Sequence, residues 1–130
     1  MEGHQIELAD EPRRVEVVID DIVVASSTRT LTLAETGLPL RHYFPRDDVA
    51  WEHLQTTTTE TVCPFKGQAS YWTVRVADTE HRDVAWSYET PIDGVDRIAG
   101  HVCFYVERAD HVIDGEILER PLSPWSQPTG

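Results

Sequence analysis

The chain contains no asparagine and only two cysteines, Cys63 and Cys103. Without asparagine there is no site for N-linked glycosylation, and nothing in the sequence indicates an oxidising export route that would join the two thiols. The N-terminal residues, Met1–Glu7, are acidic and include no apolar run, so they are not typical of a signal peptide. No window approaches the ~18 apolar residues of a membrane span. We therefore expect a cytoplasmic protein with two free thiols.

Positive charge is also scarce, because 11 Lys and Arg stand against 23 Asp and Glu, for a net charge of -12. Such a chain repels phosphate backbones and anionic lipid surfaces, so we expect neither nucleic acid nor membrane as a partner. The net charge does not exclude a small anionic ligand, since the local field at a binding site can oppose it. The 130 residues and the 40% hydrophobic fraction fit one domain with its own core.

The sequence includes none of the common catalytic or cofactor motifs. A phosphate-binding glycine loop, a dinucleotide fingerprint, His-Glu-x-x-His, Cys-x-x-Cys and Gly-x-Ser-x-Gly are all missing. The adjacent carboxylates Asp20-Asp21 and Asp47-Asp48 would point to opposite faces of a strand, which favours turn or capping roles. The six histidines are not spaced as metal-ligand pairs. We expect no metal and no cofactor.

Short apolar alternations predict a mostly β fold. Val15–Ile19 and 22–26 flank Asp20-Asp21 and predict a hairpin. Further short strands are expected over residues 28–33, 41–44, 56–59, 71–76, 84–88 and 101–106. Asp47 predicts the cap of one short helix over 48–54. Six to eight strands at a spacing of roughly ten residues favour an antiparallel sandwich or barrel-like domain over residues 13–118. Residues 1–12 and 119–130 are predicted to be flexible.

Several unusual motifs lie in the middle of the chain. They are Glu35-Thr36-Gly37, Tyr43-Phe44-Pro45, Cys63-Pro64-Phe65-Lys66-Gly67, Tyr71-Trp72 and Ala85-Trp86-Ser87-Tyr88. Their order and spacing closely resemble the domain-of-unknown-function family 427, from about Arg14 to Gly115. The resemblance implies a β-tent fold, with two small antiparallel sheets packed at an angle and one or two short helices. Many other β-tent proteins hold a structural zinc on two Cys-x-x-Cys knuckles, which this chain does not contain. The nucleotidyltransferase-like label given to the family finds no support, since paired carboxylates after a Gly-Ser turn are missing.

Charged residues in the motifs suggest ligand contacts. Arg41 and Tyr43 share one face of a short strand, where an arginine can grip a carboxylate or phosphate through two hydrogen bonds. The alternative for Arg41 is an ion pair with Glu35. Lys66, in a glycine-flanked turn, is either a ligand contact or an ordinary exposed lysine.

The two thiols differ in context. Cys63 opens a turn before Pro64 and is the candidate nucleophile of a thiol-dependent enzyme, with Lys66 favouring the thiolate. The alternative is a small apolar residue filling a corner. Because a negative surround disfavours a thiolate, we predict that Cys63 is not a catalytic nucleophile. Cys103 lies in mid-strand and is expected in the core.

Aromatic residues come from several predicted strands. Trp72 is expected in the core, Tyr71 on the opposite face, and Trp86 and Tyr88 together on a pocket wall. Our first hypothesis is a domain that binds a small anionic or aromatic molecule in a pocket between the sheets. Its expected lining is Glu35, Arg41, Tyr43, Cys63, Lys66, Tyr71, Trp86 and Tyr88. The alternatives are the thiol-dependent enzyme and an acidic module that binds a basic protein.

Overall fold

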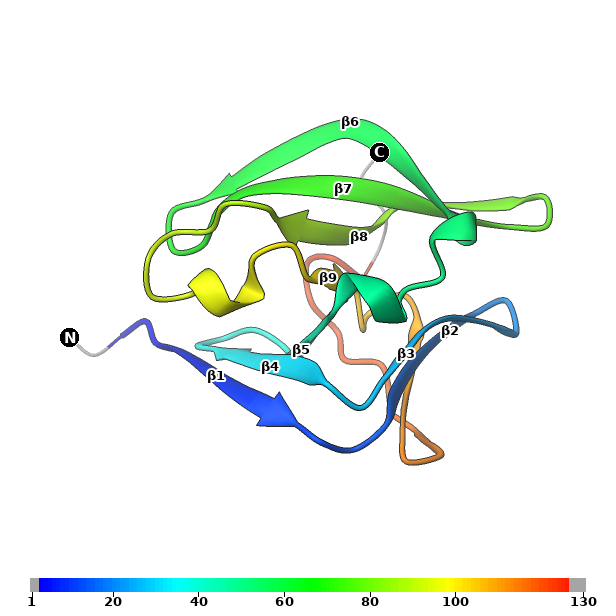
Figure 1. Cartoon of the computed structure of the whole chain (residues 1–130), viewed down its shortest axis with the longest axis horizontal. Helices are drawn as coiled ribbons and strands as arrows, with labels where there is room; N and C mark the ends of the chain where they lie inside the picture. Colours follow the sequence, from blue (N-terminus) through cyan, green and yellow to red (C-terminus); the bar gives the residue numbers. More distant parts are fainter. Residues whose placement is uncertain (1–2, 127–130) are drawn as a thin grey trace.

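Two antiparallel sheets form the described part of the chain, residues 3–126 of a computed structural model (Figure 1). In order across the seven-stranded sheet lie β1 (Ile6–Glu11), β4 (Thr30–Glu35), β5 (Arg41–Phe44), β9 (Val102–Phe104), β8 (Thr79–Tyr88), β7 (Gly67–Val76) and β6 (Leu54–Cys63). In order across the four-stranded sheet lie β11 (Glu116–Ile117), β10 (Asp110–Ile113), β2 (Val15–Ile19) and β3 (Ile22–Ser27). The predicted fold, mostly β with two antiparallel sheets, is confirmed.

The β2–β3 hairpin follows directly from its sequence. Val15, Val17 and Ile19 alternate with more exposed residues and are buried in the core. Ile19 pairs with Ile22, which leaves Asp20 and Asp21 as a two-residue loop. Both aspartates have positive φ, 50° and 66°, as the turn that best matches strand twist requires. Aspartate tolerates this conformation because its short side chain bonds locally.

The N-terminal strand corrects the prediction that residues 1–12 are flexible. Ile6–Glu11 forms β1, which pairs antiparallel with β4 along all six residues. Ile6 and Leu8 pack against the core, so β1 gains apolar burial as well as backbone hydrogen bonds. Met1 and Glu2, also in that prediction, lie outside the described residues.

The sequence predicts one or two short helices. Residues 3–126 instead contain three single turns of 3-10 helix. They are η1 (Arg46–Asp48), η2 (Trp51–His53) and η3 (Asp96–Ile98). The predicted helix over 48–54 is replaced by η1 and η2, which begin after Pro45 and Ala50 and have no side-chain cap. Asp47, the predicted cap, lies inside η1, and its neighbour Asp48 accepts a hydrogen bond from the Ser27 hydroxyl at 2.6 Å. Among the described residues, no helix has the length and apolar character to cross a membrane.

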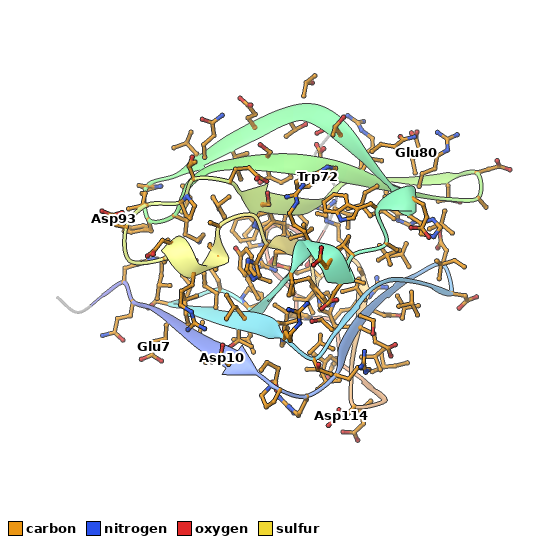
Figure 2. The ribbon with its side chains drawn as sticks, in the orientation of Figure 1. Glu7, Asp10, Trp72, Glu80, Asp93 and Asp114 are labelled. Carbon is orange, nitrogen blue, oxygen red and sulfur yellow. The ribbon has the colours of Figure 1, made fainter. Side chains whose placement is uncertain are left out.

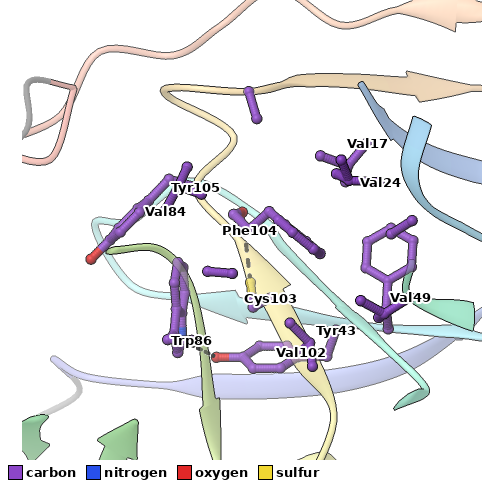
Figure 3. Close-up of a cluster of buried hydrophobic side chains, with 14 of the residues drawn as sticks. Val17, Val24, Tyr43, Val49, Val84, Trp86, Val102, Cys103, Phe104 and Tyr105 are labelled. Atoms are coloured by element: carbon purple, nitrogen blue, oxygen red, sulfur yellow. Dashed lines mark hydrogen bonds between the residues drawn. The ribbon is translucent and has the colours of Figure 1, made fainter. Parts of the chain in front are cut away.

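The core lies between the sheets and beneath β7 and β8. Phe44 and Phe104 meet edge to face, with ring centroids 5.9 Å apart. Val102 and Cys103, which precede Phe104 in β9, are fully buried as well (Figure 3). The acidic side chains labelled in Figure 2 point outward from the molecule, whereas Trp72 lies beneath the β6–β7 layer. The labelled acidic residues are Glu7, Asp10, Glu80, Asp93 and Asp114.

Candidate functional site

A cavity of about 370 Å³ opens beside the seven-stranded sheet, and we call it the aromatic cavity. All eight side chains of the predicted site line it: Glu35, Arg41, Tyr43, Cys63, Lys66, Tyr71, Trp86 and Tyr88. They come from five strands, β4 to β8, and from the turn between β6 and β7. Residues as far apart in sequence as Glu35 and Tyr88 thus share one concave surface. That they bind a ligand stays a prediction.

The position of the aromatic cavity corrects the expected pocket between the sheets. None of its lining residues, within the described chain, belongs to the four-stranded sheet. The reason is the alternation of β5, whose Arg41 and Tyr43 face the cavity. His42, between them, faces the other way and lies 6.1 Å from His111 of β10, measured between ring centroids. The cavity therefore lies on the face of β5 that is turned away from the four-stranded sheet.

The turn between β6 and β7 holds Lys66 in place. The Lys66 N–H donates to the Cys63 carbonyl oxygen at 3.2 Å, and the Lys66 carbonyl accepts from the Ile92 N–H at 2.9 Å. Gly67 has a φ of 120°, which side chains rarely adopt, and a Cβ there would lie 3.4 Å from the Pro91 Cα. Gly67 of the motif is thus needed for the backbone path that turns Lys66 into the cavity.

Lys66 is buried and forms an ion pair with Glu35. The other oxygen of Glu35, Oε2, lies 2.8 Å from His4 Nε2, and the His4 ring stacks on Phe65 at 3.8 Å between centroids. The alternative given for Arg41, an ion pair with Glu35, is therefore wrong. Lys66 takes that carboxylate because the β6–β7 turn directs its amine at the end of β4.

Arg41 finds its carboxylate in Glu107 instead. Its two terminal nitrogens donate to Glu107 Oε1 and Oε2 at 2.6 and 3.0 Å, and both residues are buried, at 6% and 4% exposure. Burial opposes the charge on Arg41, but the hydrogen bonds to Glu107 raise its pKa. Burial likewise opposes the charge on Glu107, yet hydrogen bonds from Arg41 and Ser123 lower its pKa. Both groups are thus charged at neutral pH and balance each other.

Trp86 is the centre of the aromatic wall. Its ring lies 4.4 Å from Tyr105, 6.5 Å from Tyr71 and 6.4 Å from Tyr43, measured between centroids. The Trp86 indole N–H donates to the Tyr43 hydroxyl at 3.3 Å (Figure 3). The Arg41 guanidinium lies 5.3 Å from the Trp86 ring and 5.5 Å from Tyr105. Aromatic faces and one buried cation therefore form a rigid wall.

The two cysteines differ as their sequence positions suggest. Cys63 is a half-buried free thiol on the aromatic cavity, whereas Cys103 is fully buried. Burial raises the pKa of the Cys103 thiol to about 12, so it stays protonated. No group of three His, Cys, Asp or Glu side chains within residues 3–126 is arranged to hold a metal ion.

Comparison with known proteins places the chain by family. Residues 7–115 match the model described as a domain of unknown function, DUF427. The chain belongs to the DUF427 family. No curated protein matches it. In this DUF427 domain, the motifs that carry the resemblance converge on the aromatic cavity, since Glu35, Tyr43, Lys66 and Trp86 all line it.

Other wall residues of the DUF427 domain were not predicted from the sequence. The described lining also includes His4, Phe65, Tyr105 and Trp125. Alternation along 101–106 places Tyr105 on the face of Cys103, and that signal is sufficient to find it. His4 and Trp125 lie in segments predicted to be flexible, where no local pattern marks them. Glu107 follows β9 and also shows no local signal of its pairing with Arg41.

Proposed function

We propose that this chain binds a small, uncharged aromatic molecule in the aromatic cavity. The observation that carries the proposal is the wall around Trp86, to which Tyr43, Tyr71 and Tyr105 contribute rings within 6.5 Å. Offset or edge-to-face contacts with such rings contribute about 0.5–1.5 kcal/mol each beyond area burial. A planar guest can use several of them at once.

The charges of the cavity favour an uncharged guest over an anion. Arg41 and Lys66 are each matched by a buried carboxylate, Glu107 and Glu35. An anionic ligand would have to displace one of these carboxylates or remain beside it, and leaving a buried charge unpaired is costly. The aromatic form of the predicted ligand is therefore better supported than the anionic form.

Polar groups for orienting the guest are present as well. Burial raises the pKa values of the Tyr88 and Tyr105 hydroxyls, so they stay protonated at neutral pH. A protonated hydroxyl can donate or accept a hydrogen bond. These groups suit a flat molecule with polar atoms on its edge, such as a lactam or heteroaromatic ring.

The four tryptophans allow a direct test by NMR of isotope-labelled protein. Trp86 and Trp125 line the aromatic cavity, whereas Trp51 and Trp72 pack against each other elsewhere, at 5.4 Å between centroids. Titration with oxindole, a planar uncharged lactam, should shift the indole N–H signals of Trp86 and Trp125 and leave the other two unchanged. Its fully saturated analogue should bind about 2–10-fold more weakly, as the loss of one ring contact implies.

Matched variants complete the test. Trp125→Ala removes one wall of the cavity and should weaken oxindole binding, whereas Trp51→Ala, a tryptophan outside the cavity, should leave it unchanged. Equal binding of the aromatic and saturated lactams would contradict the proposal. So would shifts centred on Trp51 and Trp72.

A further inference from the structure

The chain contains a single lysine. Of its 11 Lys and Arg residues, Lys66 is the lysine and the rest are arginine. Lysine is normally a solvated surface residue, yet Lys66 is 7% exposed and lines the aromatic cavity. A lysine amine becomes a nucleophile when it loses a proton, whereas an arginine guanidinium keeps its charge in proteins. The one side chain of this sequence that ends in a primary amine therefore belongs to the candidate site.

Three side chains meet at this amine. Glu35 Oε1 accepts a hydrogen bond from Lys66 Nζ, and Glu35 Oε2 lies 2.8 Å from His4 Nε2. All three residues line the aromatic cavity, and they come from the β6–β7 turn, the end of β4 and the segment before β1. Because Glu35 is in direct contact with the ammonium, it can take a proton from the nitrogen and later return it.

The walls around the amine select the kind of molecule that can reach it. Phe65, Trp86 and Tyr88 line the same cavity, so an aromatic ring finds ring contacts beside Lys66. The other cation of the cavity, Arg41, has both terminal nitrogens on Glu107. A guest that reacts with the amine is therefore an uncharged aromatic compound with an electrophilic carbon.

We propose that Lys66 captures a small aromatic aldehyde as a protonated imine, an inference that rests on the proposed function of the aromatic cavity. The Lys66 ammonium first gives one proton to Glu35, and the amine nitrogen attacks the aldehyde carbon. A second proton moves from nitrogen to the former carbonyl oxygen, which gives a neutral carbinolamine. Glu35 then returns its proton to that hydroxyl, the hydroxyl leaves as water, and the nitrogen lone pair forms the C=N bond. Nitrogen keeps one hydrogen and a single positive charge.

The buried ion pair favours an aldehyde over an acyl donor. A protonated imine carries one positive charge, as the ammonium does, so Glu35 keeps a cationic partner after the reaction. Acylation of the amine would remove that charge and leave the carboxylate, whose side chain is 4% exposed, without its lysine partner. Breaking a buried pair in this way is strongly unfavourable. Among the reactions of a lysine amine, imine formation therefore leaves the charges of this site balanced.

The test uses benzaldehyde and sodium cyanoborohydride with the full chain at neutral pH. The hydride reduces an imine to a stable secondary amine, and peptide mapping separates Lys66 from the α-amino group. Nα-acetyllysine in the same solution corrects for the intrinsic reactivity of the aldehyde. We expect Lys66 to gain one benzyl group at least about tenfold faster than Nα-acetyllysine, because the cavity holds the aldehyde beside the amine.

Matched probes and variants provide the controls. Cyclohexanecarbaldehyde has the same functional group without the aromatic ring, and its corrected rate at Lys66 should be about 2–10-fold lower. Lys66→Arg keeps a cation for Glu35 but forms no imine, so the adduct should disappear. Trp125→Ala, at the cavity wall, should slow the reaction, whereas Trp51→Ala, outside the cavity, should not. Should Lys66→Arg fail to fold, peptide mapping of the unaltered chain decides the question alone.

Benzyl alcohol, which has the ring but no carbonyl group, separates this inference from the proposed function. Shifts of the Trp86 and Trp125 indole signals by benzyl alcohol, with no benzaldehyde adduct at Lys66, would overturn the imine and leave the proposed function in place. Neither shifts nor an adduct would overturn both. The inference also fails if Lys66 reacts no faster than Nα-acetyllysine, or if the two aldehydes react at equal corrected rates.

Discussion

Arg41 joins the charges and the rings of the aromatic cavity. Both of its terminal nitrogens bind Glu107, and its guanidinium lies against Trp86, Tyr105 and Trp125 at 5.3–6.0 Å. A buried ion pair is weak evidence for stability, because the desolvation of both charges offsets their attraction. Removing one partner, however, strongly destabilises the fold, because it leaves the other charge buried and unpaired. Arg41 therefore acts as a fixed part of the wall and not as a free anion receptor.

At the same scale, we predict that native protein is alkylated by iodoacetamide at Cys63 and not at Cys103. Cys63 is a half-buried thiol on the aromatic cavity, whereas Cys103 is fully buried and its pKa is raised to about 12. Intact mass should show one adduct in native protein and two in denaturant. Bound oxindole should slow the reaction of Cys63, because both occupy one cavity.

Cys63→Ser is the control, and it should give no adduct in native protein. Labelling of Cys103 at a similar rate would contradict the buried position of that thiol. A Cys63 rate that has already reached its plateau near pH 7 would instead favour the thiol-dependent enzyme over the binding domain.

At the scale of elements, the sequence predicts those strands that have a local pattern of alternating apolar residues or a turn residue at their end. Residues 41–44 form β5 as predicted, because Pro45 ends a short extended run. β1 was missed because Ile6 and Leu8 are its only large apolar residues, and its backbone pairs with a strand 24 residues further on, from Ile6 to Thr30. Such pairing depends on β4 being in place and leaves little trace in the local sequence.

The residues of the candidate site likewise fall into those that the sequence could predict and those that it could not. The motifs placed Glu35, Lys66 and Trp86 at one cavity, since family motifs mark residues whatever their separation. The partner of Arg41 lies 66 residues away, and Glu107 has an ordinary local sequence. Which carboxylate meets which cation depends on strand order and on the direction of one turn. Those are properties of the folded chain.

The C-terminal segment, residues 119–126, has no regular secondary structure but contacts the cavity wall. Ser123 Oγ donates to Glu107 Oε2 at 2.6 Å, and Trp125 covers the Arg41 guanidinium. The sequence predicts a flexible tail over 119–130, of which residues 127–130 lie outside the described chain. The hydrogen bond to a buried carboxylate attaches this segment to the fold.

We predict that Ser123→Ala lowers the free energy of unfolding by about 1–2 kcal/mol, because it removes a hydrogen bond to a buried charged group. Urea denaturation is the measurement. Ser26→Ala serves as the control, since Ser26 Oγ accepts from Arg14 at 2.8 Å on the surface and its loss should cost less than about 0.5 kcal/mol. Equal, small effects of both substitutions would mean that the segment is held loosely.

At the scale of the whole molecule, the buried titratable groups include two ion pairs at the aromatic cavity, Arg41–Glu107 and Lys66–Glu35, and a pair of histidines between the sheets. The two histidines, His42 and His111, lie in the interior at 2% and 1% exposure. The His111 Nδ1–H donates to the Ala109 carbonyl at 3.1 Å, which leaves its buried Nε2 without a partner. Burial lowers the pKa of His111 from 6.5 to about 4, and it lowers that of His42 as well.

These two histidines should make the fold sensitive to mild acid. Between about pH 6.5 and pH 4 the unfolded chain binds a proton at His111 that the folded chain does not bind, so the free energy of unfolding falls as the pH falls. The carboxylates act in a lower window, because the pKa of Glu11 is about 2, held there mainly by its hydrogen bonds with Arg13. Stability from Glu11 is present above its ordinary pKa of 4.5 and is lost only below it.

We therefore predict that the free energy of unfolding falls by about 2 kcal/mol between pH 7 and pH 5 on account of His111 alone. The measurement is urea denaturation at a series of pH values in that range. His111→Gln keeps a hydrogen-bond donor but does not titrate, so it should remove at least about half of the decline. His53→Gln, a change at a partly exposed histidine, should leave the decline intact. A decline of equal size in the His111 variant would show that the proton is taken up elsewhere, and the neutral histidine pair would no longer explain the acid sensitivity.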